Sequence, residues 1–276
     1  MASMAHEPLA RAGAADPPGR TESGPPRPPA GPDREQPDVE TASDDYARRF
    51  AGSVGAWFLD LQARSTLELL RRVPPRATIL DVGGGHGQLT PALLEAGHDV
   101  VVLGSAPEAG ARIARYCESG RCRYTVGDLI NLPYPARSFD VVISFRLLPH
   151  MRAWRRVIAE ACRVARTMVI VDYPSRRSVN VLADRLFGLK RRIERNTRPF
   201  TLFRPQDIAD AFAEHDFVIT GSTPQFLWPM VLHRAHGSRL LGAALEFVPR
   251  VLGLTRLLGS PVIARAERRP ASDSGR

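Results

Sequence analysis

Short apolar runs alternate with amphipathic stretches through the middle of this 276-residue chain. The runs at 100–103 and 168–171 are continuously apolar, which is typical of parallel strands that helices cover on both faces. The pattern predicts strands at 78–82, 99–103, 123–126, 139–144 and 167–172, with helices at 88–96, 107–118 and 152–166. This alternation predicts an α/β domain built on a doubly wound, mostly parallel sheet.

Further elements flank this central series. Before it, apolar residues recur at helical spacing over 43–73 and predict two helices. After it, the pattern predicts a helix at 205–214, strands at 217–220 and 261–264, and a helical insertion at 231–258 between these last two strands. The predicted sheet therefore has seven strands and a Rossmann-like arrangement.

The first 42 residues differ in composition from the rest. They hold Pro, Gly, Ala and charged residues with almost no large apolar side chain, so burial cannot offset the entropy of ordering. We predict a disordered tail at 1–42 and a single domain at 43–270. No secretory signal or run of about 18 apolar residues is present, and the three cysteines form no C-x-x-C pair. A reduced, cytoplasmic protein without a metal is expected.

Positive charge is unevenly placed. The net charge is +9, and residues 146–203 alone contain fourteen Arg and Lys against four acidic residues. Such a segment favours nucleic acid, anionic lipid or an acidic substrate as a partner. Lys190 is the only lysine among the 38 basic residues, so a general bias toward arginine is an equally good explanation.

A glycine-rich turn follows the first predicted strand. Residues 79–88 read Ile-Leu-Asp-Val-Gly-Gly-Gly-His-Gly-Gln. Gly83, Gly85 and Gly87 allow a tight turn, whose backbone N–H groups and following helix N-terminus face an anionic part of a ligand. A dinucleotide fingerprint is G-x-G-x-x-G, and the glycines here do not have that spacing. NAD and FAD are therefore disfavoured.

A second motif lies downstream. Residues 127–134 read Gly-Asp-Leu-Ile-Asn-Leu-Pro-Tyr, and residues 138–142 read Ser-Phe-Asp-Val-Val. With the glycine turn, this pattern resembles class I S-adenosylmethionine (SAM) methyltransferases of the ubiquinone/menaquinone-biosynthesis type. The resemblance implies SAM as the cofactor, an adenine contact from Asp128 and ring packing from Leu129. The SAM contacts that it implies are Asp81, Gly83, Gly85, Gly87, Ser105, Asp128, Leu129 and Ser144.

One position departs from the family's pattern. The resemblance places an acidic residue at the end of the second strand to bind both ribose hydroxyls, but Gly104 stands there. Ser105 is expected to supply one hydroxyl contact, which is weaker than a charge-assisted pair. Replacing Gly104 with Asp is therefore expected to tighten SAM binding. The same gap leaves open a noncatalytic protein with this fold.

The acceptor is expected at the carboxyl edge of the sheet. His150 follows the fourth strand as a candidate general base, and Asp172 and Tyr173 end the fifth, where either can orient an acceptor. Residues 176–203 fall where such enzymes carry a substrate lid. Trp228, an adjacent arginine and the Leu-rich stretch beyond it favour a lipid-like acceptor and peripheral contact with the inner face of the membrane. Packing of the same stripe on the sheet is the alternative.

The sequence thus favours SAM-dependent methyl transfer to O or C of a small, hydrophobic or membrane-associated acceptor. An RNA methyltransferase is the second hypothesis, supported by the basic segment but not by aromatic residues interleaved for base stacking. Nucleic acid is accordingly the less favoured partner. The acceptor, the methylated atom and the oligomeric state stay open.

Overall fold

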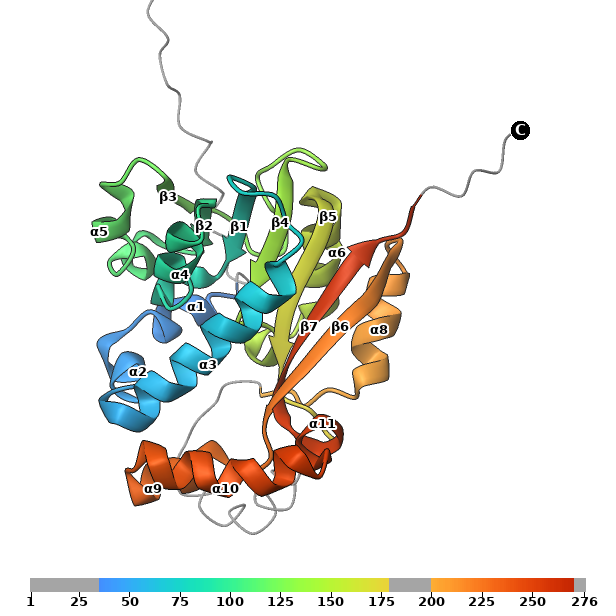
Figure 1. The fold of residues 1–276 in the computed structure, drawn as a ribbon. Coiled ribbons are helices and arrows are strands. Elements are labelled where there is room, and N and C mark those ends of the chain that lie inside the picture. The colour runs from blue at the N-terminus through green and yellow to red at the C-terminus, as the bar shows by residue number, and fades with distance from the viewer. Residues whose placement is uncertain (1–34, 179–199, 271–276) are drawn as a thin grey trace, which may run out of the picture.

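The computed structural model describes residues 35–178 and 200–270, with a seven-stranded sheet at the centre of this part of the chain (Figure 1). The strand order is β3-β2-β1-β4-β5-β7-β6. The first five strands pair in parallel, and β7 is antiparallel to both of its neighbours. The strands are β1 (Thr78–Val82), β2 (Asp99–Gly104), β3 (Cys122–Val126), β4 (Phe139–Ser144), β5 (Ala165–Tyr173), β6 (Phe217–Phe226) and β7 (Ser260–Arg268). The predicted Rossmann-like, mostly parallel sheet is confirmed.

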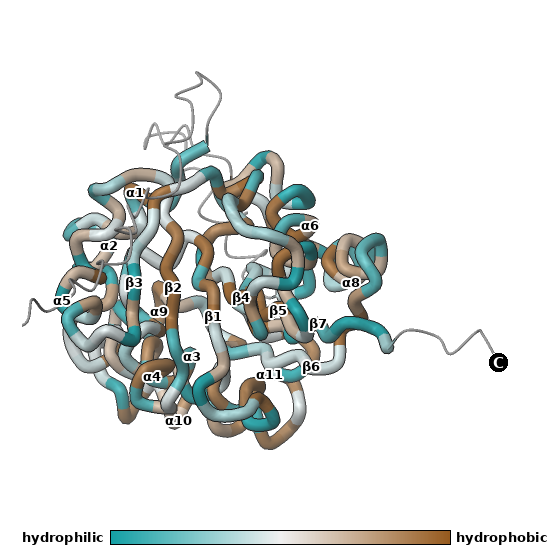
Figure 2. Tube along the Cα trace, turned by 90° about the horizontal axis from the view of Figure 1, so that it is seen from above, coloured by the Kyte–Doolittle hydropathy of each residue, from teal (hydrophilic) through white to brown (hydrophobic). Residues whose placement is uncertain are grey.

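Helices cover both faces of this sheet. Viewed from above, α6 and α8 lie on one side of the strands, and α3 and α4 lie on the other (Figure 2). The helices are α1 (Pro37–Thr41), α2 (Asp44–Arg48), α3 (Gly52–Leu70), α4 (Thr90–Glu95), α5 (Ala114–Cys117), α6 (Trp154–Val164), α8 (Pro205–Ala213), α9 (Met230–His236), α10 (Arg239–Val251) and α11 (Leu254–Leu258). The described residues also form three short 3-10 turns: η1 (Gly84–His86), η2 (Pro107–Gly110) and η3 (Leu148–His150).

The apolar strands explain the two helical layers. Successive strand residues point to opposite faces, so Leu80 joins the cluster beneath α6 and α8, whereas Ile79 joins the cluster beneath α3 and α4. Both side chains are 0% exposed. Burying one such side chain contributes about 1.5–3 kcal/mol. A strand that contributes to two cores therefore reads as a continuous apolar run.

The order in which strands are added to the sheet reverses between β1 and β4, although these two strands are parallel, and this reversal sets the place of the site. From β1 the chain continues outward to β2 and β3, whereas β4 and β5 extend the sheet on the opposite side. Ligands of open α/β sheets bind at this kind of switch point, beyond the carboxyl ends of the strands. The glycine turn follows β1 and therefore lies there.

The helix α1 lies inside the segment for which the sequence predicts a disordered tail, so the boundary at residue 42 was wrong. Polar contacts order this short stretch. The Glu35 carboxylate accepts hydrogen bonds from the backbone N–H groups of Arg152 and Ala153 at 2.7 and 3.1 Å, and Asp38 is 1% exposed. Residues 1–34, and residues 179–199 of the expected lid at 176–203, lie outside the described residues.

Two other elements differ from their predictions. The helix expected at 107–118 is divided into η2 and α5. The backbone at Gly110, where η2 ends, lies so close to Tyr124 that an added Cβ would be 2.4 Å from the ring. The strand expected at 217–220 continues to Phe226 past an irregularity between Ile219 and Gly221. Pro224 fits because β6 is an edge strand, where a missing N–H is tolerated.

Three helices, α9, α10 and α11, connect β6 to β7 and lie beyond the carboxyl ends of the parallel strands (Figure 1). Glu246 of α10 is 2% exposed and accepts hydrogen bonds from the backbone N–H groups of Leu227 and Trp228 at 2.9 and 3.0 Å. Its carboxylate also lies 3.0 Å from Nε2 of His233. These contacts fasten α10 to α9 and to the end of β6. Across residues 35–178 and 200–270, no helix has the length and apolar content needed to span a membrane.

Candidate functional site

The turn after β1 depends on glycine at several positions. Gly83 and Gly87 have φ values of 75° and 66°, which side chains rarely adopt, and the Gly83 N–H donates to the Leu103 carbonyl at 2.8 Å. At Gly85 the reason is different, because an added Cβ would lie 2.1 Å from the carbonyl oxygen of Ala109. The turn is therefore packed directly against η2.

Asp81, at the base of the turn, has no cationic partner in the part of the chain that the structure describes. Its side chain is 0% exposed, and neither carboxylate oxygen has a hydrogen-bond partner among the described residues. Burial raises its pKa to about 7. A buried carboxylate without donors is costly, and an ammonium group of a ligand would supply them. The turn and Asp81 thus fit the amino-acid end of SAM.

His86 lies within the turn and faces the loop after β4. Its Nδ1 accepts a hydrogen bond from the Gln88 N–H at 3.2 Å, which fixes the ring. Burial, and then the nearby Arg146 guanidinium, lower its pKa to about 3. The ring is therefore neutral near pH 7, and it shapes the turn without serving as a proton acceptor.

The ribose region differs from the expectation drawn from the resemblance. A Cβ on Gly104 would lie 1.9 Å from Oη of Tyr124, which donates to the Ala106 carbonyl at 2.6 Å. A side chain at this position would require the end of Tyr124 to move, which disfavours an acidic residue there. Tighter SAM binding by Asp at position 104 stays a prediction. The Asp38 carboxylate accepts hydrogen bonds from the Ser105 N–H at 2.7 Å and its hydroxyl at 2.5 Å. A carboxylate does lie at the end of β2, but it comes from α1.

The other expected SAM contacts are placed as follows. Asp128 is partly buried, and its Oδ1 accepts a hydrogen bond from the Ile130 N–H at 3.0 Å. Leu129 is 1% exposed within the core beneath α6, so it offers no open surface to an adenine ring. The Ser144 hydroxyl donates to the Val82 carbonyl at 3.1 Å and thereby ties β4 to β1. Ser144 therefore makes a structural contact between two strands, and Leu129 is part of the hydrophobic core.

A cavity of about 480 Å³ opens at the same edge of the sheet, between α2, α3, α9 and the loops that follow β4 and β5. It is lined by the aromatic side chains Tyr46, Phe50, Phe58, Phe200 and Phe226. The charged and titratable residues that line it are Arg49, Arg146, Arg234, Asp172 and His150. This volume lies within the range of about 300–1,000 Å³ that is usual for small-molecule sites.

The end of β5 supplies one residue to this cavity, not two. Asp172 lines it, accepts a hydrogen bond from the Arg146 N–H at 2.6 Å, and has a pKa raised by burial to about 6. Tyr173 points to the opposite face, packs against Phe203 and is 3% exposed. Burial raises the pKa of Tyr173 to about 12. The structure thus places Tyr173 in the core, whereas His150 lies in the cavity wall with its ring 5.6 Å from that of Phe200.

One loop joins the turn to the cavity. Arg146, directly after β4, lines the cavity and has a left-handed φ of 58°. The next side chain, Leu147, contacts the turn closely enough that a Cβ on Gly83 would lie 3.1 Å from it. The glycine turn and the cavity therefore lie on either side of the same loop.

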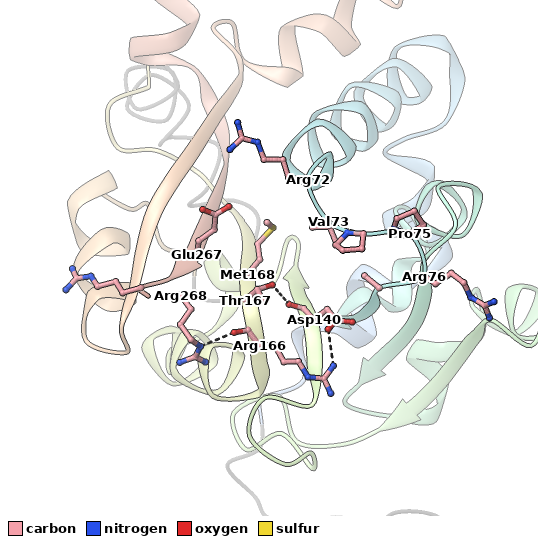
Figure 3. A pocket seen from close by; sticks show the side chains of 13 residues that line it. Arg72, Val73, Pro75, Arg76, Asp140, Arg166, Thr167, Met168, Glu267 and Arg268 are labelled. Atoms are coloured by element: carbon pink, nitrogen blue, oxygen red, sulfur yellow. Dashed lines mark hydrogen bonds and ion pairs between the residues drawn. The ribbon is translucent and has the colours of Figure 1, made fainter. Parts of the chain in front are cut away.

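A larger cavity, of about 730 Å³, lies at the amino ends of the parallel strands, on the edge opposite the glycine turn (Figure 3). Its Asp140 accepts hydrogen bonds from the N–H and hydroxyl of Thr78, both at 2.8 Å, and pairs with Arg166 at 3.0 Å. Asp140 therefore has a structural role. Within the described ranges, no group of His, Cys, Asp and Glu side chains is arranged to hold a metal ion.

Asp38 and Arg49 had not been singled out from the sequence, and Phe50 and Arg234 had not been assigned to a binding site. Asp38, Arg49, Phe50 and Arg234 come from α1, from the segment after α2 and from α9, and only the fold brings them to the carboxyl edge. Asp38 lay in a stretch whose composition predicts disorder. The sequence marks the two arginines by their positive charge, and this does not distinguish them from the other basic residues among the 38 in the chain.

Comparison with known proteins gives evidence on the family that is independent of the site's geometry. Residues 79–167 match the family model described as "Methyltransferase domain". The chain is 35% identical over 112 residues to 27-O-demethylrifamycin SV methyltransferase of Amycolatopsis mediterranei (strain S699), covering 37% of this chain and 40% of that protein. It is 28% identical over 120 residues to "Probable tRNA methyltransferase 9B" of Bos taurus, covering 42% of this chain and 25% of that protein. The chain therefore spans less than half the length of these curated relatives.

A solved structure extends the likeness to most of the fold. Magnesium protoporphyrin IX methyltransferase (ChlM) from Synechocystis PCC 6803, with bound SAH, superposes with a TM-score of 0.58 at 15% identity. The match covers 82% of this chain and 93% of that chain. The region matched by the family model contains the glycine turn and both downstream motifs. Residues 79–167 are therefore similar to a methyltransferase domain, and the described part of the chain has the fold of a class I SAM-dependent methyltransferase.

Proposed function

We propose that this protein transfers the methyl group of SAM to an oxygen or carbon atom of a small, hydrophobic acceptor held in the carboxyl-edge cavity. The observation that carries the proposal is the unsatisfied Asp81 carboxylate beneath a glycine turn, with an aromatic-lined cavity across Leu147. One relative named as a small-molecule methyltransferase, from Amycolatopsis mediterranei, supports this acceptor class.

The donor side uses residues of the β1 turn. When bound, SAM supplies a methyl group on a sulfonium, which leaves as a neutral thioether. Asp81 would accept hydrogen bonds from the ammonium of its amino-acid end, and the backbone of the turn at Gly85 would lie against the carboxylate. The Gly83 N–H is not available to the ligand, because it donates to the Leu103 carbonyl. Neutral His86 closes the side of the turn that faces β4.

The acceptor side supplies alignment and a proton acceptor. Methyl transfer needs an in-line approach, so the aromatic walls promote the reaction by holding the acceptor and excluding water. For a hydroxyl acceptor, His150 takes the proton, and Asp172, ionised at neutral pH with its pKa of about 6, orients the hydroxyl.

Calorimetry with S-adenosylhomocysteine (SAH) tests the donor half of the proposal. Wild type is expected to bind it, and Asp81→Asn is expected to weaken binding at least tenfold because the ammonium loses a charged acceptor. Absence of binding at millimolar SAH would refute the proposal. Incubation with trideuteromethyl SAM and a small-molecule extract, followed by mass spectrometry, then searches for labelled products.

We also propose peripheral membrane contact through α10 and α11. Apolar side chains that are at least 48% exposed there are Leu240, Leu241, Phe247, Val248, Val251, Leu252 and Leu257. Arg239 and Arg256 lie in the same helices and suit anionic headgroups. Co-sedimentation with phosphatidylglycerol vesicles should fall for Phe247→Glu but not for Val218→Glu on β6. Equal retention of wild type and Phe247→Glu would exclude this surface.

RNA methylation is the second candidate function. It is favoured by the relative named as a tRNA methyltransferase and by the larger cavity, which is lined by five arginines and two acidic residues. Filter binding of total tRNA at increasing salt is the test, because phosphate contacts make affinity fall steeply with ionic strength. Tight, salt-sensitive binding that Arg72→Gln and Arg76→Gln weaken would favour RNA over a small acceptor.

A further inference from the structure

Three arginines meet at the carboxyl-edge cavity from separate parts of the chain: Arg49 after α2, Arg146 after β4 and Arg234 in α9. Two of them share one aromatic ring. The Arg146 guanidinium lies 4.0 Å from the ring centre of Phe50, and the Arg234 guanidinium lies 5.7 Å from it. The fold therefore places two positive charges next to a single aromatic ring.

This positive charge is poorly compensated among the described residues. None of the three arginines pairs with a carboxylate there, and Asp172 is the one acidic residue in the cavity wall. The Asp172 carboxylate accepts from the backbone N–H of Arg146, not from its guanidinium. Burial, together with Arg49 and Arg146, lowers the pKa of Arg234, which indicates a cost of holding these charges close together.

Arg146 has spare hydrogen-bonding capacity inside the protein. One of its terminal nitrogens donates to Oε1 of Gln62 at 2.7 Å, and the other is buried without a partner in the described part of the chain. A guanidinium offers paired N–H groups that match the two oxygens of a carboxylate. A buried donor of this kind needs an acceptor, and the carboxylate of a bound ligand can supply it.

We propose that this cavity binds a flat, apolar molecule through a carboxylate that Arg146 and Arg234 hold, with the aromatic walls enclosing its hydrocarbon part. The inference rests on the proposed function only in naming this molecule the methyl acceptor. Arg49, which is exposed beside the entrance, adds positive charge that attracts the anion. Asp172 disfavours a carboxylate near itself by charge repulsion, so the anionic end faces the arginines.

A matched set of probes tests this assignment by calorimetry. The carboxylate 2-naphthoate and the neutral 2-naphthamide have the same ring system and nearly the same shape. Wild type is expected to bind the carboxylate at least tenfold more tightly. Arg234→Gln and Arg146→Gln are expected to remove that preference while leaving the weak binding of the amide in place.

Arg115→Gln is the matched control, because this exposed arginine stacks on Tyr116 at 4.7 Å outside the cavity. It should bind both probes as wild type does. Equal affinity of wild type for the two probes, or a carboxylate preference that survives both cavity variants, would overturn the proposal.

SAH affinity, measured on the same variants, separates this inference from the proposed function. Unchanged SAH binding by Arg234→Gln, together with loss of the carboxylate preference, supports an anion site distinct from the donor turn. Carboxylate preference in a protein that does not bind SAH would keep the anion site and refute the methyltransferase proposal. SAH binding without carboxylate preference would refute the anion site and keep the methyltransferase proposal.

Discussion

The buried Asp81 carboxylate predicts that SAH affinity depends on pH. The ionised carboxylate is the form that accepts hydrogen bonds from the ligand's ammonium, and the pKa of Asp81 without ligand is about 7. At one unit below this value, about a tenth of the protein is ionised, so affinity should be about tenfold lower, equal to about 1.36 kcal/mol. Affinity should reach a plateau above about pH 8. Calorimetric titration with SAH from pH 6 to 9 measures this dependence.

The same group makes the ligand-free protein less stable as pH rises. The ordinary pKa of an aspartate is 3.8, whereas that of Asp81 in the fold is about 7. Between these pH values the carboxyl group is ionised in the unfolded chain but protonated in the folded one, so the folded state loses stability as pH rises. A difference of about three units corresponds to a cost on the order of 4 kcal/mol at pH 8. Asp81→Asn should therefore raise the free energy of unfolding at pH 8, with a smaller gain at pH 5, as it loses SAH binding.

Urea unfolding of wild type and Asp81→Asn at the two pH values checks the stability half of this prediction. His86 does not interfere, because its pKa of about 3 keeps it neutral throughout this range. An SAH affinity that stays constant from pH 6 to 9, or an Asp81→Asn protein less stable than wild type at pH 8, would refute the reasoning. Either result would mean that the carboxylate has partners that the fold does not show.

Three further substitutions have defined outcomes. Gly85→Ala places a Cβ 2.1 Å from a backbone oxygen of Ala109, so the free energy of unfolding should fall by about 1–3 kcal/mol and SAH should bind more weakly. An SAH affinity equal to that of wild type would contradict the packing of the turn on η2. Glu246→Ala leaves the buried N–H of Leu227 and the partly buried N–H of Trp228 without acceptors and should cost about 1–3 kcal/mol in urea unfolding. A loss well below about 1 kcal/mol would show that water replaces the carboxylate. Asp38→Ala removes both acceptors of Ser105 and should lower the melting temperature by several degrees, and an unchanged value would mean that α1 contributes nothing to stability.

The sequence predicted the elements that local physics determines. Strand β4 was predicted at its observed bounds, because a buried parallel strand needs a continuous apolar run. The glycine turn was also predictable, since Gly83 and Gly87 have a backbone conformation that other residues rarely adopt. The extension of β6 beyond residue 220 was missed, because Pro224 normally ends a strand and only its position at the sheet edge permits it.

The acceptor side of the site was less accessible to sequence reasoning. Asp172 and Tyr173 looked equivalent as neighbours, and only the pleat of β5 decides which one faces the cavity. Arg146 and Arg234 are far apart in the sequence but both lie near the ring of Phe50. The periodicity of apolar residues along the chain does not predict this contact. The space that Tyr124 occupies beside Gly104 is likewise a tertiary effect.

The pair Arg146 and Leu147 has one side chain in the cavity wall and the next against the glycine turn. A ligand that shifts either residue must therefore alter the neighbouring compartment as well. Thermodynamic linkage requires this influence to be mutual, so that each of two bound molecules changes the other's affinity by the same factor. In the proposed function, any coupling between donor and acceptor runs through these two adjacent residues, and a change of side-chain size at position 147 is expected to alter it.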